Sequence, residues 1–216
     1  SIRYEGDTIT ITMENILSDV KILRKPEFET VRYNTKLSFI PSERNLVSVI
    51  RNIDQSYRSA ESDVLFNYIF EWGEAKDSYT AEHPKRLSFT DNIEYINDGG
   101  NDLVRLINEN KMIPVYYASS GVQSAMPLDV MADYFTGLVG KNASVSKHDL
   151  ANTLARYLGK DKELTNEMLK SISNKMKYQS VQLFIEEPEQ NLYPDSQRNL
   201  TINLVCALKQ AMPKGR

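Results

Sequence analysis

Cysteine, histidine and tryptophan are scarce in this sequence. Cys206 is the single cysteine among 216 residues, and His83 and His148 are the two histidines. One cysteine excludes an internal disulfide, and two distant histidines without nearby cysteines argue against a structural zinc site. Cys206 lies in the apolar run 204–208, where we expect a buried, unreactive thiol rather than a nucleophile.

Long apolar runs and an excess of basic charge are also absent. No uninterrupted apolar run approaches the roughly 20 residues of a membrane-spanning helix, and the first residues do not resemble a signal sequence. The net charge is −3 with 25% charged residues, so the composition gives no global electrostatic footprint for nucleic acid. With 41% hydrophobic residues, the chain can fill the core of one sizeable domain, or of a domain and a half of smaller size. We therefore expect a soluble, cytoplasmic protein that does not associate with a membrane.

The most informative segment runs from Val181 to Pro194. Its apolar run ends at Ile185, two glutamates follow, and Pro188 prevents a simple continuation of a strand ladder. This pattern predicts a buried strand with two carboxylates at its C-terminal tip, the end at which open α/β sheets bind ligands. Glu186 would hold Mg²⁺ through water, and Glu187 would orient an attacking water. An acidic, solvated turn after a core strand is the alternative interpretation.

Residues 1–41 are expected to contain strands. The alternating, β-branched residues 7–13 predict a strand at the edge of a sheet. Residues 36–40 predict a second short strand, which Pro41 closes.

Residues 42–98 are expected to be mainly helical. Ser42 would cap a first helix, whose apolar stripe is Leu46, Val49, Ile50, Ile53 and Tyr57. A second helix would begin near Ser62 and stop at Gly73. A third would cover about residues 84–96, before the pair Gly99 and Gly100 breaks it.

Residues 102–118 predict a β-hairpin. Two apolar stretches, 103–107 and 112–117, flank the polar turn 108–110. The hairpin leads into a helix over 119–140, in which Pro127 should cause a kink or separate the first turn. Gly137 and Gly140 should end this helix.

The start of that helix is rich in small and hydroxyl residues. Ser119, Ser120 and Gly121 can expose backbone N–H groups and cap the helix. A helix N-terminus of this kind can bind an anion, although an ordinary Ser/Gly cap is the alternative.

The last third of the chain is expected to contain more helices. Residues 141–178 predict a helical insertion on the surface, which would provide partner specificity or act as a lid. Within 181–216, Asp195 would cap a final helix after the acidic strand, and the stripe of that helix is Leu200, Leu204 and Leu208.

Two of these segments resemble motifs of ABC-type ATPases, in the branch with RecF, SMC and the overcoming-lysogenization-defect proteins. Residues 184–194, Phe-Ile-Glu-Glu-Pro-Glu-Gln-Asn-Leu-Tyr-Pro, resemble the Walker B and D-loop segment, and residues 117–123, Tyr-Ala-Ser-Ser-Gly-Val-Gln, resemble the signature motif. Residues 39–45, Phe-Ile-Pro-Ser-Glu-Arg-Asn, are similar to a less specific strand-turn segment of uncharacterised bacterial members. The fold class implied is α/β, a partial P-loop ATPase domain with a hairpin region and a helical insertion.

The resemblance implies a role for each matching residue. Glu186 would be the Walker B acid near Mg²⁺, where many relatives have aspartate, and Glu187 would be the catalytic glutamate. The signature residues would contact ATP bound to the opposite subunit, and they are Ser119, Ser120, Gly121 and Gln123. The D-loop residues Asn191 and Leu192 would touch that subunit. Arg44 is a weaker candidate for a nucleotide or interface contact, and a solvated arginine is the alternative.

The sequence departs from the family in one important motif. No Gly-x-x-x-x-Gly-Lys-Ser/Thr occurs, and residues 137–142, Gly-Leu-Val-Gly-Lys-Asn, have the wrong spacing. We therefore expect an internal or C-terminal piece of a longer ATPase that is inactive alone. The complete protein is expected to bind ATP and Mg²⁺ and to dimerise around ATP, with a second copy as partner. A nuclease effector or DNA, in DNA repair or phage defence, would be further partners. A degenerate, non-catalytic interaction module on the same fold is the alternative.

Overall fold

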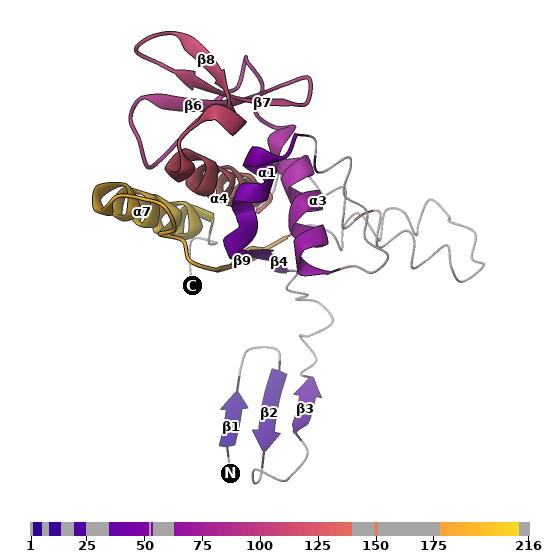
Figure 1. Cartoon of the computed structure of the whole chain (residues 1–216). Coiled ribbons are helices and arrows are strands. Elements are labelled where there is room, and N and C mark those ends of the chain that lie inside the picture. The colour runs from indigo at the N-terminus through magenta and orange to yellow at the C-terminus, as the bar shows by residue number, and fades with distance from the viewer. Residues whose placement is uncertain are drawn as a thin grey trace, which may run out of the picture. The chain divides into compact units, whose positions relative to one another are not determined.

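The computed structural model describes residues 2–5, 9–13, 20–24, 35–51, 53, 63–139, 150 and 178–211. The chain divides into two compact units, Ser1–Asn34 and Thr35–Arg216 (Figure 1). The helical insertion expected over 141–178 lies outside the described residues, except at residues 150 and 178. Strands and helices both occur in the described part of the chain, so the general α/β class expected from the sequence is confirmed.

The first unit contains an antiparallel sheet in the order β1-β2-β3. Its strands are β1 (Ile2–Glu5), β2 (Ile9–Met13) and β3 (Lys21–Arg24). The strand expected from the alternation of residues 7–13 is confirmed as β2. Its expected position at an edge was wrong, because β2 pairs with β1 on one side and β3 on the other. Alternation reports the two faces of a strand and carries no information about its neighbours in the sheet.

A pair of parallel strands organises the second unit. These are β4 (Thr35–Ile40) and β9 (Ser180–Ile185), both close to the segments predicted from the sequence. They pair in register from Thr35 opposite Ser180 to Ile40 opposite Ile185. The carboxyl ends of parallel strands meet at one edge, so the turn after Ile40 lies beside the glutamates after Ile185. The ladder continues for one more bond, from the backbone N–H of Glu186 to the Ile40 carbonyl at 3.0 Å.

The second unit also contains an antiparallel sheet in the order β5-β6-β7-β8. Its strands are β5 (Lys85–Arg86), β6 (Ile93–Asp98), β7 (Asn101–Leu106) and β8 (Lys111–Pro114). The helix expected over 84–96 was therefore wrong. Gly99 and Gly100, with φ of 58° and 92°, form the two-residue turn that joins β6 to β7, and such turns favour glycine because both residues need positive φ. Because this turn leads the chain back, β6 pairs with β7 in a hairpin. This pairing outweighs the helical pattern of residues 93–98.

The hairpin expected over 102–118 is confirmed as β7 and β8, with a shorter second strand. After Pro114 the residues Val115–Tyr117 form a 3-10 helix instead of continuing β8. The chain then enters α4 (Ser120–Gly137), which ends at Gly137 as expected and contains Pro127 in its interior. Gly140 lies outside the described residues.

The helices that precede and follow α4 differ in detail from the expected ones. After β4 the chain forms a 3-10 helix, Ser42–Asn45, and a short α1 (Leu46–Val49), which ends where Ile50 becomes extended. Pro41, and not Ser42, precedes this helical segment. The long amphipathic helix expected there is therefore interrupted after Val49, and Tyr57 of its stripe lies outside the described residues.

The other two helices carry apolar faces of the core. Helix α3 (Val64–Lys76) starts at the Asp63 cap, whose side chain accepts from the Phe66 N–H at 2.6 Å, and runs through Gly73. The stop expected at Gly73 was wrong, because burial of Trp72 and Ala75 outweighs the roughly 1 kcal/mol cost of a helical glycine. Helix α7 (Pro194–Ala211) begins one residue before the expected Asp195 cap, with proline at a favoured first position.

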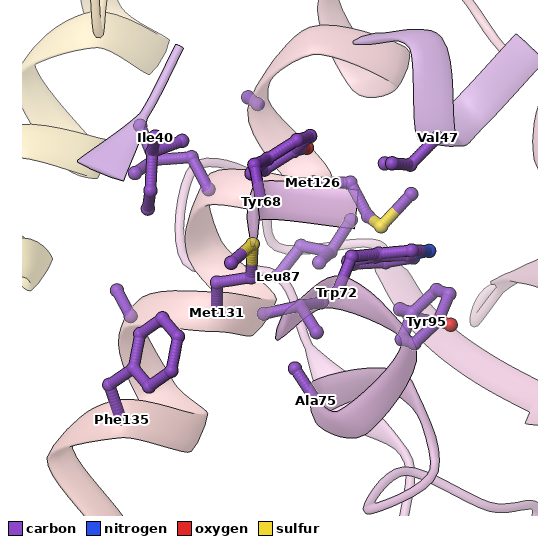
Figure 2. Packing of buried hydrophobic residues seen from close by; sticks show 14 of the residues in the cluster. Ile40, Val47, Tyr68, Trp72, Ala75, Leu87, Tyr95, Met126, Met131 and Phe135 are labelled. Atoms are coloured by element: carbon purple, nitrogen blue, oxygen red, sulfur yellow. The ribbon is translucent and has the colours of Figure 1, made fainter. Parts of the chain in front are cut away.

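The core of the second unit forms where α3 and α4 pack against each other and against the two sheets of that unit (Figure 2). The Trp72 and Tyr95 rings lie 5.6 Å apart, and Met126, Met131 and Phe135 of α4 are fully buried. Helix α7 adds Leu200 and Leu204 to this cluster. Cys206 on α7 is exposed, so its expected burial was wrong. Cys206 lies two residues after the buried Leu204, which is about 200° around a helix of 3.6 residues per turn, and so it is on the opposite face of α7.

Every helix that the structure describes is too short or too polar to span a lipid bilayer.

Candidate functional site

Glu186 and Glu187 lie at the carboxyl tip of β9, as the sequence predicted, and both side chains are exposed. The Glu186 carboxylate reaches across to the end of β4, where Oε2 accepts from the Ser42 backbone N–H at 3.2 Å. The Ser42 hydroxyl lies 3.4 Å from the same oxygen. The parallel pairing of β4 and β9 thus places a carboxylate and a hydroxyl side by side in solvent.

Glu187 has an unusual backbone conformation. Its φ is 42°, in the left-handed region, which costs a non-glycine residue on the order of 1–3 kcal/mol and often marks a functional position. The Glu187 carbonyl accepts from the Gln190 N–H at 3.0 Å, which closes the turn that follows. The turn points the chain away from the sheet directly after the second carboxylate.

The Arg44 side chain hydrogen-bonds the backbone at this tip of β9. Its side chain is completely buried and donates from Nη1 to the Glu186 carbonyl at 2.7 Å and from Nη2 to the Glu187 carbonyl at 2.6 Å. Burial lowers the pKa of Arg44, although the nearby Tyr68, Glu187 and Glu189 oppose that change. The alternative of a solvated arginine was wrong, because the Arg44 side chain is buried, whereas its contact with a nucleotide or an interface stays a prediction.

The start of α4 forms the second part of the site. Ser119 is the N-cap, and its Oγ accepts from the Val122 N–H at 3.4 Å. Ser119 and Ser120 are exposed, so the N-terminus of α4 is open to solvent. The first backbone N–H groups of a helix have no partner within the helix, and they form a favourable position for an anion.

Gly121 connects this helix to the loop after Glu187. A Cβ added to Gly121 would lie 2.9 Å from the Asn191 carbonyl oxygen and 3.6 Å from Cδ2 of Leu192. The Ser124 hydroxyl also donates to Oε1 of Gln190 at 3.2 Å. The predicted signature and D-loop segments therefore lie against each other within one chain.

The remaining predicted site residues differ in their exposure and in their contacts within the chain. Asn191 is exposed, with φ of 61°, whereas Leu192 is half-buried against the core of its own chain. The Gln123 side chain donates to the carbonyls of Val115 at 3.3 Å and Tyr116 at 3.0 Å. Gln123 and Leu192 thus support the loops of this chain, and Asn191 is the D-loop residue that is open to contact.

The side chains at the tip suit a hard cation that is held mainly by other ligands. In the described part of the chain, no group of three or more His, Cys, Asp or Glu side chains could hold a metal ion. Mg²⁺ commonly takes only one or two protein carboxylates, with water and substrate phosphates completing its octahedron. Glu186 with the adjacent Ser42 oxygen fits that donor set.

A cavity of about 220 Å³ lies elsewhere in the second unit. It is lined by α1 and by the β6–β7 turn, including Ser48, Arg51, Asp98 and Tyr116, and by none of the predicted site residues. Arg51 stacks on the Tyr116 ring at 4.2 Å and hydrogen-bonds its hydroxyl. The residues predicted to carry the chemistry therefore lie near the carboxyl ends of the parallel strands β4 and β9 and do not line this cavity.

Sequence reasoning missed the partners that build the site. The sequence pattern indicates Ser42 as a helix cap only, and it gives no sign that Ser124 and Gln190 form a pair. The signal available was that two predicted strands end at Pro41 and at Glu186, because the carboxyl ends of two such strands converge if the strands pair in parallel. The sequence does not show that these two strands are neighbours in one sheet.

The arrangement can bind an anion at the start of α4 and can orient water with carboxylates at the tip of β9. Comparison of the chain with protein-family models, with curated proteins and with solved structures gives no match. Function is therefore inferred from these residues, their geometry and the motif resemblance.

Proposed function

We propose that this chain forms the signature, Walker B and D-loop portion of an ABC-type ATPase head that hydrolyses ATP with Mg²⁺. One observation carries the proposal: Glu187 is held in a left-handed conformation at the tip of β9, and the loop that follows packs on the first turn of α4. Left-handed non-glycine residues concentrate at functional sites. Here one coincides with the glutamate that the motif resemblance makes catalytic.

The chemistry assigned to Glu187 is the orientation and deprotonation of a water. The water oxygen forms a bond to the γ-phosphorus, the bond from that phosphorus to the bridging oxygen of ADP breaks, and the water proton passes to the Glu187 carboxylate. The exposure of Glu187 leaves its carboxylate accessible to such a water. Glu186, beside Ser42, would hold Mg²⁺ through water, and the cation supplies neutralisation of phosphate charge.

The proposed site is shared between two copies of the chain. The exposed residues Ser119 and Ser120, followed by Gly121, would face the γ-phosphate bound by the partner, and Asn191 would contact the partner's surface. No Gly-x-x-x-x-Gly-Lys-Ser/Thr occurs in the 216 residues, and the proposal therefore requires a phosphate cradle outside them. We propose DNA or a nuclease effector as further partners and the cytoplasm as the location, on the motif resemblance alone.

The test is ATP turnover by the full-length protein that contains this chain, with Mg²⁺ and with oligomeric state followed by light scattering. We expect Glu187→Gln to lower kcat by about 10²–10⁴-fold, as for loss of a general base, and still to form a dimer with ATP. Glu189→Gln is the matched control, because Glu189 is an exposed glutamate two residues along the same turn. We expect it to stay within about 3-fold of wild type, as an exposed residue outside the reacting groups. Equal activity of wild type and Glu187→Gln would exclude the proposed role of Glu187.

The second candidate is a non-catalytic interaction module on the same scaffold. It is favoured by the missing phosphate cradle and by the apolar side chains that the outer face of β4 and β9 exposes, Leu37, Phe39 and Phe184. Exposed apolar patches often mark contact surfaces. If the full-length protein neither binds nor hydrolyses ATP, this second function replaces the first.

A further inference from the structure

Arg44 is a fully buried arginine that connects the two halves of the proposed site. We propose that Arg44 is a positioning residue for ATP hydrolysis: it fixes the backbone of Glu186 and Glu187 to helix α4, so that the hydrolytic carboxylate and the phosphate-binding helix keep one relative geometry. This inference rests on the proposed ATPase function and adds a residue that neither the motifs nor the resemblance assigns to positioning.

The guanidinium joins three segments that are distant in sequence. Nε donates to the Ser124 carbonyl in α4 at 2.9 Å, and Nη1 donates to the Pro41 carbonyl after β4 at 3.3 Å. The other two bonds go to the carbonyls of Glu186 and Glu187 after β9, at 2.7 and 2.6 Å. These partners lie 80, 3, 142 and 143 residues away in the sequence. One side chain therefore sets the position of α4 relative to both strand ends.

The geometry of these four bonds requires arginine. A guanidinium has five N–H donors in a rigid plane, whereas a lysine ammonium is a compact point with three donors. The four carbonyl acceptors use all three guanidinium nitrogens. A lysine at position 44 could keep the charge, but its single nitrogen could not reach α4 and both glutamate carbonyls together.

The hydrogen bond from Arg44 to the Glu187 carbonyl holds Glu187 in its strained conformation. Glu187 keeps a φ of 42°, which persists only where surrounding contacts hold it. The 2.6 Å bond from Nη2 ends on the carbonyl of this same residue. Without it we expect the turn to relax and the carboxylate to move, and a displacement of about 1 Å can cost on the order of 10²-fold in rate.

Tyr68 of α3 holds the segment from which Arg44 projects. Its hydroxyl donates to the Arg44 carbonyl at 2.7 Å, and the ring is completely buried. Burial raises the pKa of Tyr68 well above its ordinary value, so this hydroxyl remains a donor at neutral pH. Arg44 is thus held at its backbone and by its side chain.

The experiment measures ATP turnover by the full-length protein with Arg44→Lys. We expect kcat to fall by about 10-fold to 10²-fold, with the KM for ATP within about 3-fold of wild type, because misplacement of the base affects the reaction and not ground-state binding. Arg51→Lys is the matched control, because Arg51 is an exposed arginine seven residues along that stacks on Tyr116. Its kcat should stay within about 2-fold of wild type.

Each other result has a defined meaning. An unchanged kcat in Arg44→Lys overturns the inference, and so does a rise in KM without a fall in kcat, which would make Arg44 a binding residue. If Arg44→Lys fails to fold, Tyr68→Phe decides: a fall in kcat of about 3-fold or more at constant KM supports the inference, and unchanged kinetics overturn it. If wild type itself shows no ATP turnover, the proposed function fails, and this inference fails with it.

Discussion

Gly121 of helix α4 lies directly against the carbonyl oxygen of Asn191, so closely that a Cβ on Gly121 would sit 2.9 Å from that oxygen. Asn191 contributes to the contact through its own backbone, which has a φ of 61° and turns the carbonyl. Asparagine tolerates this left-handed region better than most residues. The contact joins the proposed signature helix to the proposed D-loop and leaves no room there for a side chain at position 121.

Replacing Gly121 with alanine should therefore destabilise the chain. We expect Gly121→Ala to lower the free energy of unfolding by about 1–3 kcal/mol, as overpacking against rigid backbone does. The control is Gly137→Ala at the other end of the same helix, where an added Cβ would meet nothing within 4 Å. That change should be neutral or stabilising by up to about 1 kcal/mol. Urea unfolding compares the two variants, and equal stabilities would contradict the tight contact.

Glycine at position 187 should be more stable than alanine, the reverse of the usual order. The φ of Glu187 is 42°, so Glu187→Gly should be about 1 kcal/mol more stable than Glu187→Ala. At the neighbouring Glu189, whose φ is not positive, Glu189→Gly should instead be less stable than Glu189→Ala by about 0.5–1 kcal/mol. Chemical denaturation of the four variants tests both orders, and the same order at both positions would rule out backbone strain at Glu187.

The buried pair of Lys36 and Glu71 should be strongly coupled. Lys36 Nζ lies 2.6 Å from Glu71 Oε1, and the two side chains are 4% and 7% exposed. Ser38 Oγ donates to the other carboxylate oxygen at 2.5 Å. Lys36→Met leaves a buried carboxylate without its cation and should cost about 3–5 kcal/mol.

The double variant Lys36→Met with Glu71→Gln removes the unpaired charge and keeps an acceptor for Ser38. It should recover most of the lost stability, as replacing both members of a buried pair often does. A double-mutant cycle from urea midpoints gives the coupling. A double variant as unstable as the sum of the single variants would show that the pair contributes nothing specific.

Asp129 should make stability depend on pH. Burial raises the pKa of this carboxyl above its ordinary value of 3.8, against the opposing effects of Lys85 and of the Ser88 N–H, which donates to Oδ2 at 2.5 Å. The groups that face it are Lys85, with Nζ 4.0 Å from Oδ1, and Asp133, whose Oδ2 accepts from the Tyr79 hydroxyl at 2.7 Å. The folded state therefore binds this proton more tightly than the unfolded state.

The stabilisation from the protonated Asp129 is fully present below the unfolded pKa and is lost as pH rises through the raised folded pKa. Asp129→Asn cannot titrate, so the stability of wild type relative to this variant should fall as pH increases from about 4 toward neutrality. Urea unfolding of both proteins across this range measures the difference. If wild type instead gains on the variant with rising pH, attraction to Lys85 exceeds the cost of burial.

Local patterns predicted the elements that depend on a few consecutive residues. The strands β4 and β9, the hairpin of β7 and β8, the Ser119 cap and the end of α4 at Gly137 all follow from alternation, turn residues or caps. The two glutamates at the tip of β9 were predicted in the same way, from an apolar run that ends in acidic residues and proline, but the expected burial of that strand was wrong, because its residues are half-buried or exposed.

The errors occurred where a neighbour outside the local segment decides the outcome. Residues 93–98 form β6 because Gly99 and Gly100 turn the chain back and β7 pairs with them. Arg44 is buried because carbonyls from three segments surround its guanidinium. Cys206 is exposed because the buried face of α7 is the one that contacts α4.

The sequence by itself determined the strands β4 and β9, the hairpin of β7 and β8, the Ser119 cap and which residues carry reactive groups, because these depend on backbone preferences within one turn or one strand. Only the tertiary structure decided that β4 pairs with β9, that Ser42 approaches Glu186, and that Gly121 contacts Asn191. Such contacts join residues between 70 and 145 positions apart. Their formation depends on the packing of the whole unit, because no local preference can select one distant partner among many.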